Sequence, residues 1–372
     1  MYGSRKPRTS NRKPKIAYTK YMQPKRILII RTDRIGDVAL STPVIKALRN
    51  AFPNSYIAFM VRPYAREIVE GNPYLDEVII YDKDGIHRRF FSTLLFSLCM
   101  RKKRFDTAII LHPTNRAHII AFVAGIPNRI GLNRKLPFLL TKALSDEKFR
   151  GQKHELEYTL DILKSIDVEV FDKSLYMPVT KSNEASVDIK LSQKGVKGSD
   201  LLIAVHPDAS CPSKRWPLER FASLIDKLKT NYDVRIVLVS GPEEAAKIVE
   251  LKQKLKSEVI DLAGQTSVGE LAALLKRCKL FISNDSGPVH IATAVGTPSV
   301  VIFGRKQPGL SPKRWAPTGK EDIVLHKDVG CQVCLAHNCK NGFKCLEAIT
   351  VDEVFNAVKK LLIHLSCNVT DK

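Results

Sequence analysis

The first half of the chain alternates short apolar, β-branched runs with longer amphipathic stretches. From position 26 onward this pattern predicts a parallel sheet flanked by helices. The predicted strands are Ile27–Ile30, Tyr56–Val61, Glu77–Tyr81 and Thr107–Leu111. The predicted helices lie around Val38–Phe52, Tyr64–Glu70 and Arg88–Arg104.

The same alternation starts again in the second half. Its predicted strands are Leu201–Val205, Val234–Val239, Val259–Leu262, Leu280–Ile282 and Ser299–Phe303, separated by helices such as Leu218–Thr230 and Pro242–Leu255. The pattern therefore predicts an α/β protein with two Rossmann-like domains, and 372 residues suit two domains better than one.

Polar, glycine-containing sequence between positions 170 and 200 predicts the domain boundary. We expect a first domain over residues 26–185 and a second over 186–349. A last helix near Val351–Leu365, in the segment 350–372, is a candidate to pack back on the first domain.

Ligands of open parallel sheets bind beyond the carboxyl ends of the strands. Two such sheets facing each other form a cleft with one set of loops on each wall, and this is where we expect the chemistry. On the first wall, Asp37 follows Gly36 at the junction of the first strand and its helix. Its carboxylate either faces the cleft or neutralises free amides in the first helical turn. Pro43 indicates that the helix kinks, or begins only at Ser41 or Thr42.

Two arginines follow the fourth predicted strand, Arg116 in H-P-T-N-R and Arg129 in G-I-P-N-R-I-G. Guanidinium groups suit the phosphate or carboxylate groups of an acidic ligand. The alternative for each is an ordinary solvated arginine.

On the second wall, Lys214 stands in K-R-W-P, just before a helix that Pro217 can initiate. A cation beside free helix amides is suited to a diphosphate. A carboxylate of S-G-P-E-E, positions 240–244, either accepts hydrogen bonds from ribose hydroxyls or complements a helix N-terminus.

The run D-S-G-P-V-H follows another predicted strand and begins at Asp285. Amides of Ser286 and Gly287 at a helix start can bind pyrophosphate oxygens without a metal. His290 lies one helical turn further on and faces the same way as Ser286. It is either a ligand contact or a packed core histidine.

Taken in order, these segments resemble glycosyltransferase family 9, the ADP-heptose:lipopolysaccharide heptosyltransferases. The opening R-x-D-x-x-G-D-x5-P at positions 31–43 is similar to the family's first loop, and the resemblance covers nearly all of positions 26–362. It implies the GT-B fold, with two Rossmann-like domains facing each other across a cleft, and no required metal or other cofactor. It also implies that Asp37 is the catalytic base, with Asp33 as the rival on the same loop.

For the remaining residues, the resemblance implies donor contacts by Lys214, Glu243 and the run from Asp285 to His290. It implies acceptor contacts by Arg116 and Arg129. The hypothesis is inverting transfer of heptose from ADP-heptose to the lipid A-Kdo type inner core of lipopolysaccharide. The alternatives are a family 9 transferase with another nucleotide sugar or acceptor, and a non-catalytic anion-binding protein on this scaffold.

The net charge is +22, and the first 26 residues hold nine Lys or Arg and no acid. We expect residues 1–25 to form a disordered tail that binds the anionic face of the cytoplasmic membrane, or one that only aids solubility. Charge alone would attract RNA or DNA equally, and no specific nucleic-acid partner is expected. Since the sequence has neither an apolar run of spanning length nor a secretory signal, we expect a cytoplasmic, peripheral protein.

Four of the eight cysteines are clustered as Cys331-x2-Cys334-x4-Cys339-x5-Cys345. This spacing is compatible with a structural zinc site. The short second interval is also compatible with reduced thiols that simply pack.

Overall fold

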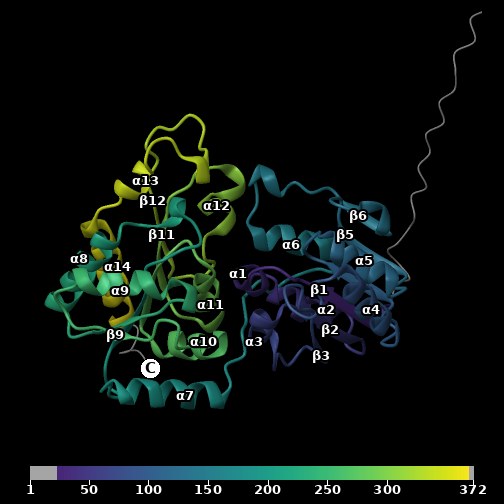
Figure 1. The fold of residues 1–372 in the computed structure, drawn as a ribbon, viewed down its shortest axis with the longest axis horizontal. Coiled ribbons are helices and arrows are strands. Elements are labelled where there is room, and N and C mark those ends of the chain that lie inside the picture. The colour runs from purple at the N-terminus through teal and green to yellow at the C-terminus, as the bar shows by residue number, and fades with distance from the viewer. Residues whose placement is uncertain (1–22, 368–372) are drawn as a thin grey trace, which may run out of the picture.

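The computed structural model describes residues 23–367, which form two α/β domains, each built on one six-stranded sheet (Figure 1). The strand orders are β3-β2-β1-β4-β5-β6 and β12-β11-β10-β7-β8-β9. Counted within each domain, both orders are 3-2-1-4-5-6, and all strand pairs are parallel. The prediction of two Rossmann-like domains is therefore confirmed.

The first domain contains six strands and six α-helices within the described residues. The strands are β1 (Arg26–Ile30), β2 (Tyr56–Val61), β3 (Glu77–Ile80), β4 (Thr107–Ile110), β5 (Asn128–Leu132) and β6 (Lys142–Leu144). The α-helices are α1 (Ile35–Ala39), α2 (Thr42–Ala51), α3 (Arg66–Val69), α4 (Phe90–Arg101), α5 (Asn115–Val123) and α6 (Glu155–Lys164). Short 3-10 turns are η1 (Pro63–Ala65), η2 (Pro137–Leu139) and η3 (Lys148–Arg150).

The second domain repeats this plan and adds helices at its end. Its strands are β7 (Leu202–His206), β8 (Arg235–Leu238), β9 (Ile260–Asp261), β10 (Leu280–Asn284), β11 (Ser299–Phe303) and β12 (Ile323–His326). Its α-helices are α7 (Lys181–Gln193), α8 (Leu218–Asn231), α9 (Ala245–Lys254), α10 (Val268–Arg277), α11 (Gly287–Val295), α12 (Pro312–Trp315), α13 (Lys344–Glu347) and α14 (Val351–Cys367). Its 3-10 turns are η4 (Pro212–Lys214), η5 (Pro242–Glu244), η6 (Pro308–Leu310) and η7 (Ala336–Asn338).

Each sheet is covered on both faces, so its central strands are buried along nearly their whole length. Helices α4 and α5 cover one face of the first sheet, and α8, α9 and α14 cover one face of the second. The other two faces contribute to a single buried cluster that runs through both domains. Helices α1 and α11 meet in this shared region, so the domains are packed against each other.

Every predicted strand has a counterpart, and Pro43 acts as expected because α1 ends at Ala39 and α2 begins at Thr42 with the proline in its first turn. Three strands had not been predicted, namely β5, β6 and β12. They are short or begin in polar sequence, so their apolar content gives little signal.

The structure corrects the prediction for the last helix. Helix α14 packs on α8, β10 and β11, with Val354, Val358 and Leu361 buried in the second core. It therefore belongs to the second domain and not to the first. Helix α7 also packs on the second domain, through α10, so a boundary at 185 falls inside α7 and the second domain begins near Lys181.

The predicted tail over residues 1–25 lies almost wholly outside the described residues, which begin at position 23. Within the described range, no helix combines the length and apolar character needed to cross a membrane.

Candidate active site

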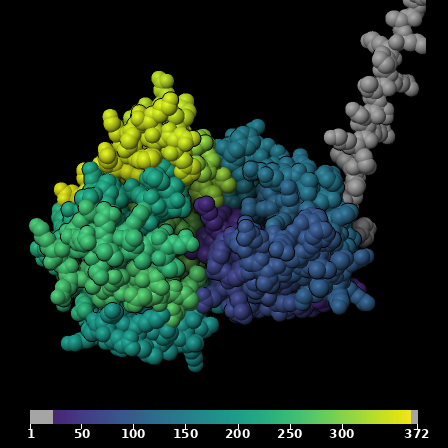
Figure 2. All heavy atoms as spheres, in the orientation of Figure 1, coloured from purple at the N-terminus to yellow at the C-terminus, as the bar shows by residue number. Residues whose placement is uncertain are grey.

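A cavity of about 840 Å³ lies between the loops of the two domains. Its first-domain wall is formed by residues 34–37 and Tyr64. Its second-domain wall is formed by loops that follow β7, β8, β10 and β11, together with His337 after β12. In Figure 2 the two domains meet beside the purple segment that begins the first domain. Seven residues singled out from the sequence line this cavity: Asp37, Lys214, Glu243, Asp285, Ser286, Gly287 and His290.

Asp37 is held on the first wall by a buried arginine. Arg31, only 2% exposed, donates from Nη2 to Asp37 Oδ1 at 2.7 Å and from Nε to Asp33 Oδ1 at 2.9 Å. Its Nη1 donates to the carbonyl of Leu111. Asp33 is not among the residues that line the cavity, so Asp37 is the carboxylate of this loop that a ligand would meet.

A third carboxylate, Glu155, lies behind Asp37 and is 1% exposed. It pairs with Arg31 at 3.3 Å, with Lys148 at 2.5 Å and with Arg314 of the second domain at 2.7 Å. Burial alone would raise the pKa of Glu155, but Lys148, Arg31 and Arg314 together lower it to about 2. Glu155 is therefore ionised and joins the two domains next to the candidate base.

The environment of Asp37 makes it a better proton acceptor than an ordinary aspartate. Burial and the negative charge of Asp33 raise the pKa of Asp37 to about 6, although Arg31 opposes the shift. A carboxylate with this pKa is ionised at neutral pH, yet binds a proton more firmly than a solvated one.

The second wall groups two cations around one carboxylate, apart from the two glutamates of the loop after β8. Asp285 pairs with Lys214 at 3.2 Å and with Arg305 at 2.5 Å. Both cations line the cavity, so two positive charges share one carboxylate there. This arrangement leaves one net positive charge for an anionic ligand.

Helix α11 begins at the same point, and its first residues, Gly287 and Pro288, line the cavity. The partial positive charge of a helix N-terminus adds to that of the two cations. Ser286 precedes the helix, and its hydroxyl lies 2.9 Å from that of Ser283.

Gly287 has a further role that the sequence did not indicate. A Cβ at this position would lie 2.7 Å from Ile35 Cγ1 in the first domain, and a Cβ on Gly36 would lie 3.1 Å from Gly287 Cα. The two glycines therefore permit the close approach of α1 and α11.

His290 is buried beside this contact. Burial, with a smaller contribution from neighbouring His154, lowers the pKa of His290 to about 3, so the ring is neutral at physiological pH. Its Nδ1 has no hydrogen-bond partner among the described residues. His290 can therefore exchange a hydrogen bond with a ligand, but it does not contribute a charge.

Two roles were considered for a carboxylate of this loop, contact with a ligand hydroxyl and neutralisation of a helix N-terminus, and the two glutamates differ in which role they suit. Glu244 contacts Nε2 of His206 at 3.2 Å and accepts from the amide of Gly241. Glu243 is exposed at the cavity and forms no ion pair with the described part of the chain. It is thus the carboxylate available for a ligand hydroxyl.

The structure places neither of the two predicted acceptor arginines in the lining of this cavity, and their acceptor contacts stay a prediction. Arg116 donates to the carbonyls of Lys83, His87 and Arg88 and so fastens the loop before α4. Arg129 lies near the amino end of β5, the edge of the sheet remote from the ligand loops, and donates to backbone carbonyls around it.

The site also contains residues that the sequence analysis missed. Arg305 follows β11 after Gly304, so the rule of strand carboxyl ends that identified Asp285 also applies to it. Arg31, likewise, directly follows β1. Glu155 and Arg314 gave no such signal, because Glu155 meets Arg31 and Arg314 across 124 and 159 positions, and Lys148 joins the site only through Glu155.

The four clustered cysteines line a separate cavity of about 230 Å³ near β12. In residues 23–367, no three His, Cys, Asp or Glu side chains are grouped so as to hold a metal ion. A structural metal there stays a prediction, which elemental analysis of purified protein would test.

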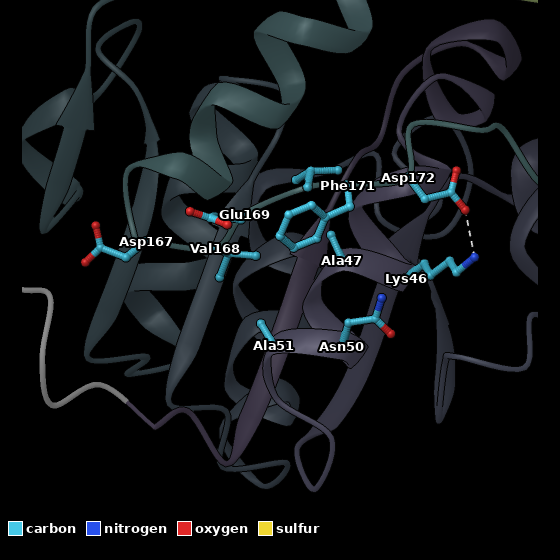
Figure 3. Close-up of a pocket in the computed structure, with 10 residues that line it drawn as sticks. Lys46, Ala47, Asn50, Ala51, Asp167, Val168, Glu169, Phe171 and Asp172 are labelled. Carbon is cyan, nitrogen blue, oxygen red and sulfur yellow. Dashed lines mark hydrogen bonds and ion pairs between the residues drawn. The ribbon is translucent and has the colours of Figure 1, made fainter.

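Another cavity, of about 320 Å³, lies between α2 and residues 167–172 (Figure 3). Lys46 pairs with Asp172 across its rim at 2.7 Å, and Phe171 lies beside it. None of its lining residues belongs to the cleft described above.

Two Rossmann-like domains with a carboxylate on one wall of their cleft and cations with a helix N-terminus on the other define a glycosyltransferase of the GT-B class. Comparison with known families agrees with this architecture. The chain belongs to glycosyltransferase family 9 (heptosyltransferase), whose family model matches residues 96–344. The resemblance that the motifs indicated is thereby confirmed.

Individual relatives are similar over most of the chain. Lipopolysaccharide heptosyltransferase 2 of Escherichia coli K12 is 24% identical over 91% of this chain and 99% of its own. The crystal structure of a family 9 glycosyltransferase from Veillonella parvula is 28% identical, with a TM-score of 0.82 over 91% of this chain and 98% of that one. The structure of Escherichia coli ADP-heptose lipopolysaccharide heptosyltransferase II is 22% identical and shares the fold. Its TM-score is 0.75, over 92% of this chain and 99% of that one.

Proposed function

We propose that this glycosyltransferase is an inverting heptosyltransferase that uses ADP-heptose as donor and the lipid A-Kdo type inner core of lipopolysaccharide as acceptor. The names of its relatives support the donor and acceptor classes. The observation that carries the chemistry is Asp37 on one wall of the cavity, opposite Lys214, Arg305 and the start of α11 on the other.

In this proposal Asp37 takes the proton of an acceptor hydroxyl as its oxygen attacks the anomeric carbon. The bond between that carbon and the diphosphate breaks, and ADP leaves with the electron pair. A single displacement inverts the anomeric configuration. Arg31 keeps the Asp37 carboxylate in position, while Asp33 and Glu155 hold Arg31.

The donor would bind the second domain. Lys214, Arg305 and the amides at the start of α11 stabilise the diphosphate as negative charge develops on it. Glu243 accepts hydrogen bonds from ribose hydroxyls, and His290 supplies a neutral hydrogen-bonding group. Because two cations and a helix terminus already serve the diphosphate, we propose that turnover requires no metal and survives chelation by EDTA.

The acceptor would bind the first domain. Arg116 and Arg129 are committed to backbone carbonyls, so we propose that Arg34, exposed at the cavity, meets an acidic group of the acceptor. The enzyme would work at the cytoplasmic face of the membrane, and the nine cations of its first 26 residues would attract it to anionic lipid.

The test is a turnover assay with the purified full chain, a lipid A-Kdo acceptor and a panel of nucleotide sugars. We expect transfer from ADP-heptose with inversion at the anomeric carbon. Preference for another donor would identify a different family 9 activity. Binding of polyanions without turnover of any donor would favour the non-catalytic alternative.

A further inference from the structure

Helix α4 presents an apolar face that no other described element covers. Phe91, Leu95 and Leu98 follow one another at helical spacing and are 75%, 64% and 43% exposed. Phe90 lies beside Phe91, with its ring in edge contact at 6.1 Å between centroids. Ile86, just before the helix, is 76% exposed.

The exposed apolar surface continues onto the neighbouring elements. Helix α4 packs along α5, which carries the exposed Phe122, and α5 packs on η2, which carries the exposed Phe138. In Figure 1, α4 and α5 lie at the end of the first domain that faces away from the second. We call these seven residues the α4 patch: Ile86, Phe90, Phe91, Leu95, Leu98, Phe122 and Phe138. Groups of exposed apolar side chains on packed elements mark sites of interaction.

The charge around the α4 patch is almost entirely positive. Between positions 85 and 145 the sequence has eleven Lys or Arg and one acid, Asp106. Arg88 and Arg89 precede the exposed face of α4, and Arg101 and Lys102 follow it. All four are exposed, and none forms an ion pair with another described residue. Negative charge on the partner would therefore meet cations at both ends of the helix.

We propose that the α4 patch is the surface by which this enzyme docks on an anionic lipid bilayer. An apolar helix face bordered by Lys and Arg is suited to the boundary between headgroups and acyl chains. Each cation near anionic lipid adds attraction. A second copy of the chain would bring the same cations together, so self-association through this face is opposed by like charges.

Hydrogen bonds and an ion pair connect the α4 patch to the cleft. Arg116 fastens the loop before α4, and Asp84 of that loop pairs with Arg62. Arg62 also donates to the hydroxyl of Tyr64, which lines the cavity and donates to the carbonyl of Asp33 at 2.8 Å. These contacts link the α4 patch to the wall assigned to the acceptor, although α4 itself lies at the end of the first domain that faces away from the cleft (Figure 1). The value of this link for catalysis rests on the proposed function, whereas the docking itself does not.

The test is co-sedimentation of the full chain with vesicles of phosphatidylcholine, with and without phosphatidylglycerol. We expect binding only to the vesicles that contain phosphatidylglycerol. The affinity of the double variant Phe90→Ser/Phe91→Ser for these vesicles should be at least about tenfold lower, because two aromatic side chains no longer enter the lipid. Arg88→Ser/Arg89→Ser should also weaken binding and make it less sensitive to salt.

The matched control is Phe171→Ser, which removes a still more exposed phenylalanine beside another cavity and should bind like the wild type. Wild-type binding by the Phe90→Ser/Phe91→Ser variant, with all binding lost on deletion of residues 1–22, would overturn the proposal in favour of the tail. A wild-type dimer that this variant converts to monomer would overturn it in favour of a second copy. Turnover of a detergent-solubilised acceptor should be the same in the Phe90→Ser/Phe91→Ser variant and the wild type. Vesicle binding does not depend on the donor, so a failure of ADP-heptose as donor would count against the proposed function and not against the docking surface.

Discussion

The two walls of the cleft share a fold and differ in how their charged side chains are grouped. Both sheets have the strand order 3-2-1-4-5-6, and both walls place loops at the carboxyl ends of their strands. The first wall holds the carboxylates of Asp33, Asp37 and Glu155 around Arg31, whereas the second holds Lys214 and Arg305 around the single carboxylate of Asp285. Under the proposed function, one scaffold would supply a base on one side and anion stabilisation on the other, because chemistry depends on loop side chains and not on the sheet.

The largest loss of turnover is expected when the proposed base on the first wall is removed. Asp37→Asn is nearly isosteric, so fold and ADP affinity should be kept, while kcat falls by about 100-fold or more. Steady-state kinetics and calorimetry with ADP measure the two effects. Turnover close to wild type would contradict the assignment, and a comparable loss in Asp33→Asn alone would move the role to Asp33.

Removing a cation from the second wall should lower ADP affinity, which removing Asp37 should leave unchanged. Lys214→Met should weaken ADP binding and reduce kcat/KM by about 10- to 100-fold, the scale of a charge-assisted hydrogen bond. Lys306→Met is the matched control, since Lys306 pairs with Asp328 and does not line the cavity. Equal ADP affinity in the two variants would refute the role of Lys214.

The contact between the walls can be tested at Gly287. Gly287→Ala places a Cβ against Ile35, which should separate α1 from α11 and lower kcat/KM by about tenfold. Ile35→Ala should relieve the clash, so the double variant should recover part of the lost activity. A double variant no better than Gly287→Ala would instead favour loss of direct ligand contact at the glycine.

The smallest expected effect concerns pH. Asp37 acts in its ionised form, so kcat/KM should fall as the pH drops through about 6, the pKa to which burial and Asp33 raise this carboxyl. The negative charge of Glu155 also raises the pKa of Asp37, so Glu155→Gln should move this acid limb to lower pH. Glu157→Gln, on the same helix but paired with Lys173, should leave the limb in place. An unchanged limb in Glu155→Gln would show that Glu155 does not act on the base.

The sequence by itself was enough to locate residues whose role depends on local chain geometry. Asp37, Asp285 and Gly287 each follow a predicted strand at a turn into a helix, and parallel sheets gather such turns at one edge. The short apolar runs between amphipathic stretches predicted both sheets. Strands that are buried on two faces need a nearly continuous apolar sequence, and this is a local signal.

Only the tertiary structure decided which remote groups meet. Glu155 lies 124 positions from Arg31 and 159 from Arg314, and no local pattern encodes either pairing. Arg116 and Arg129 could be identified as cations, but their bonding to nearby carbonyls depends on how the loops fold. The amphipathic pattern of α14 predicts that one face is buried but not on which sheet, because either core offers an apolar surface.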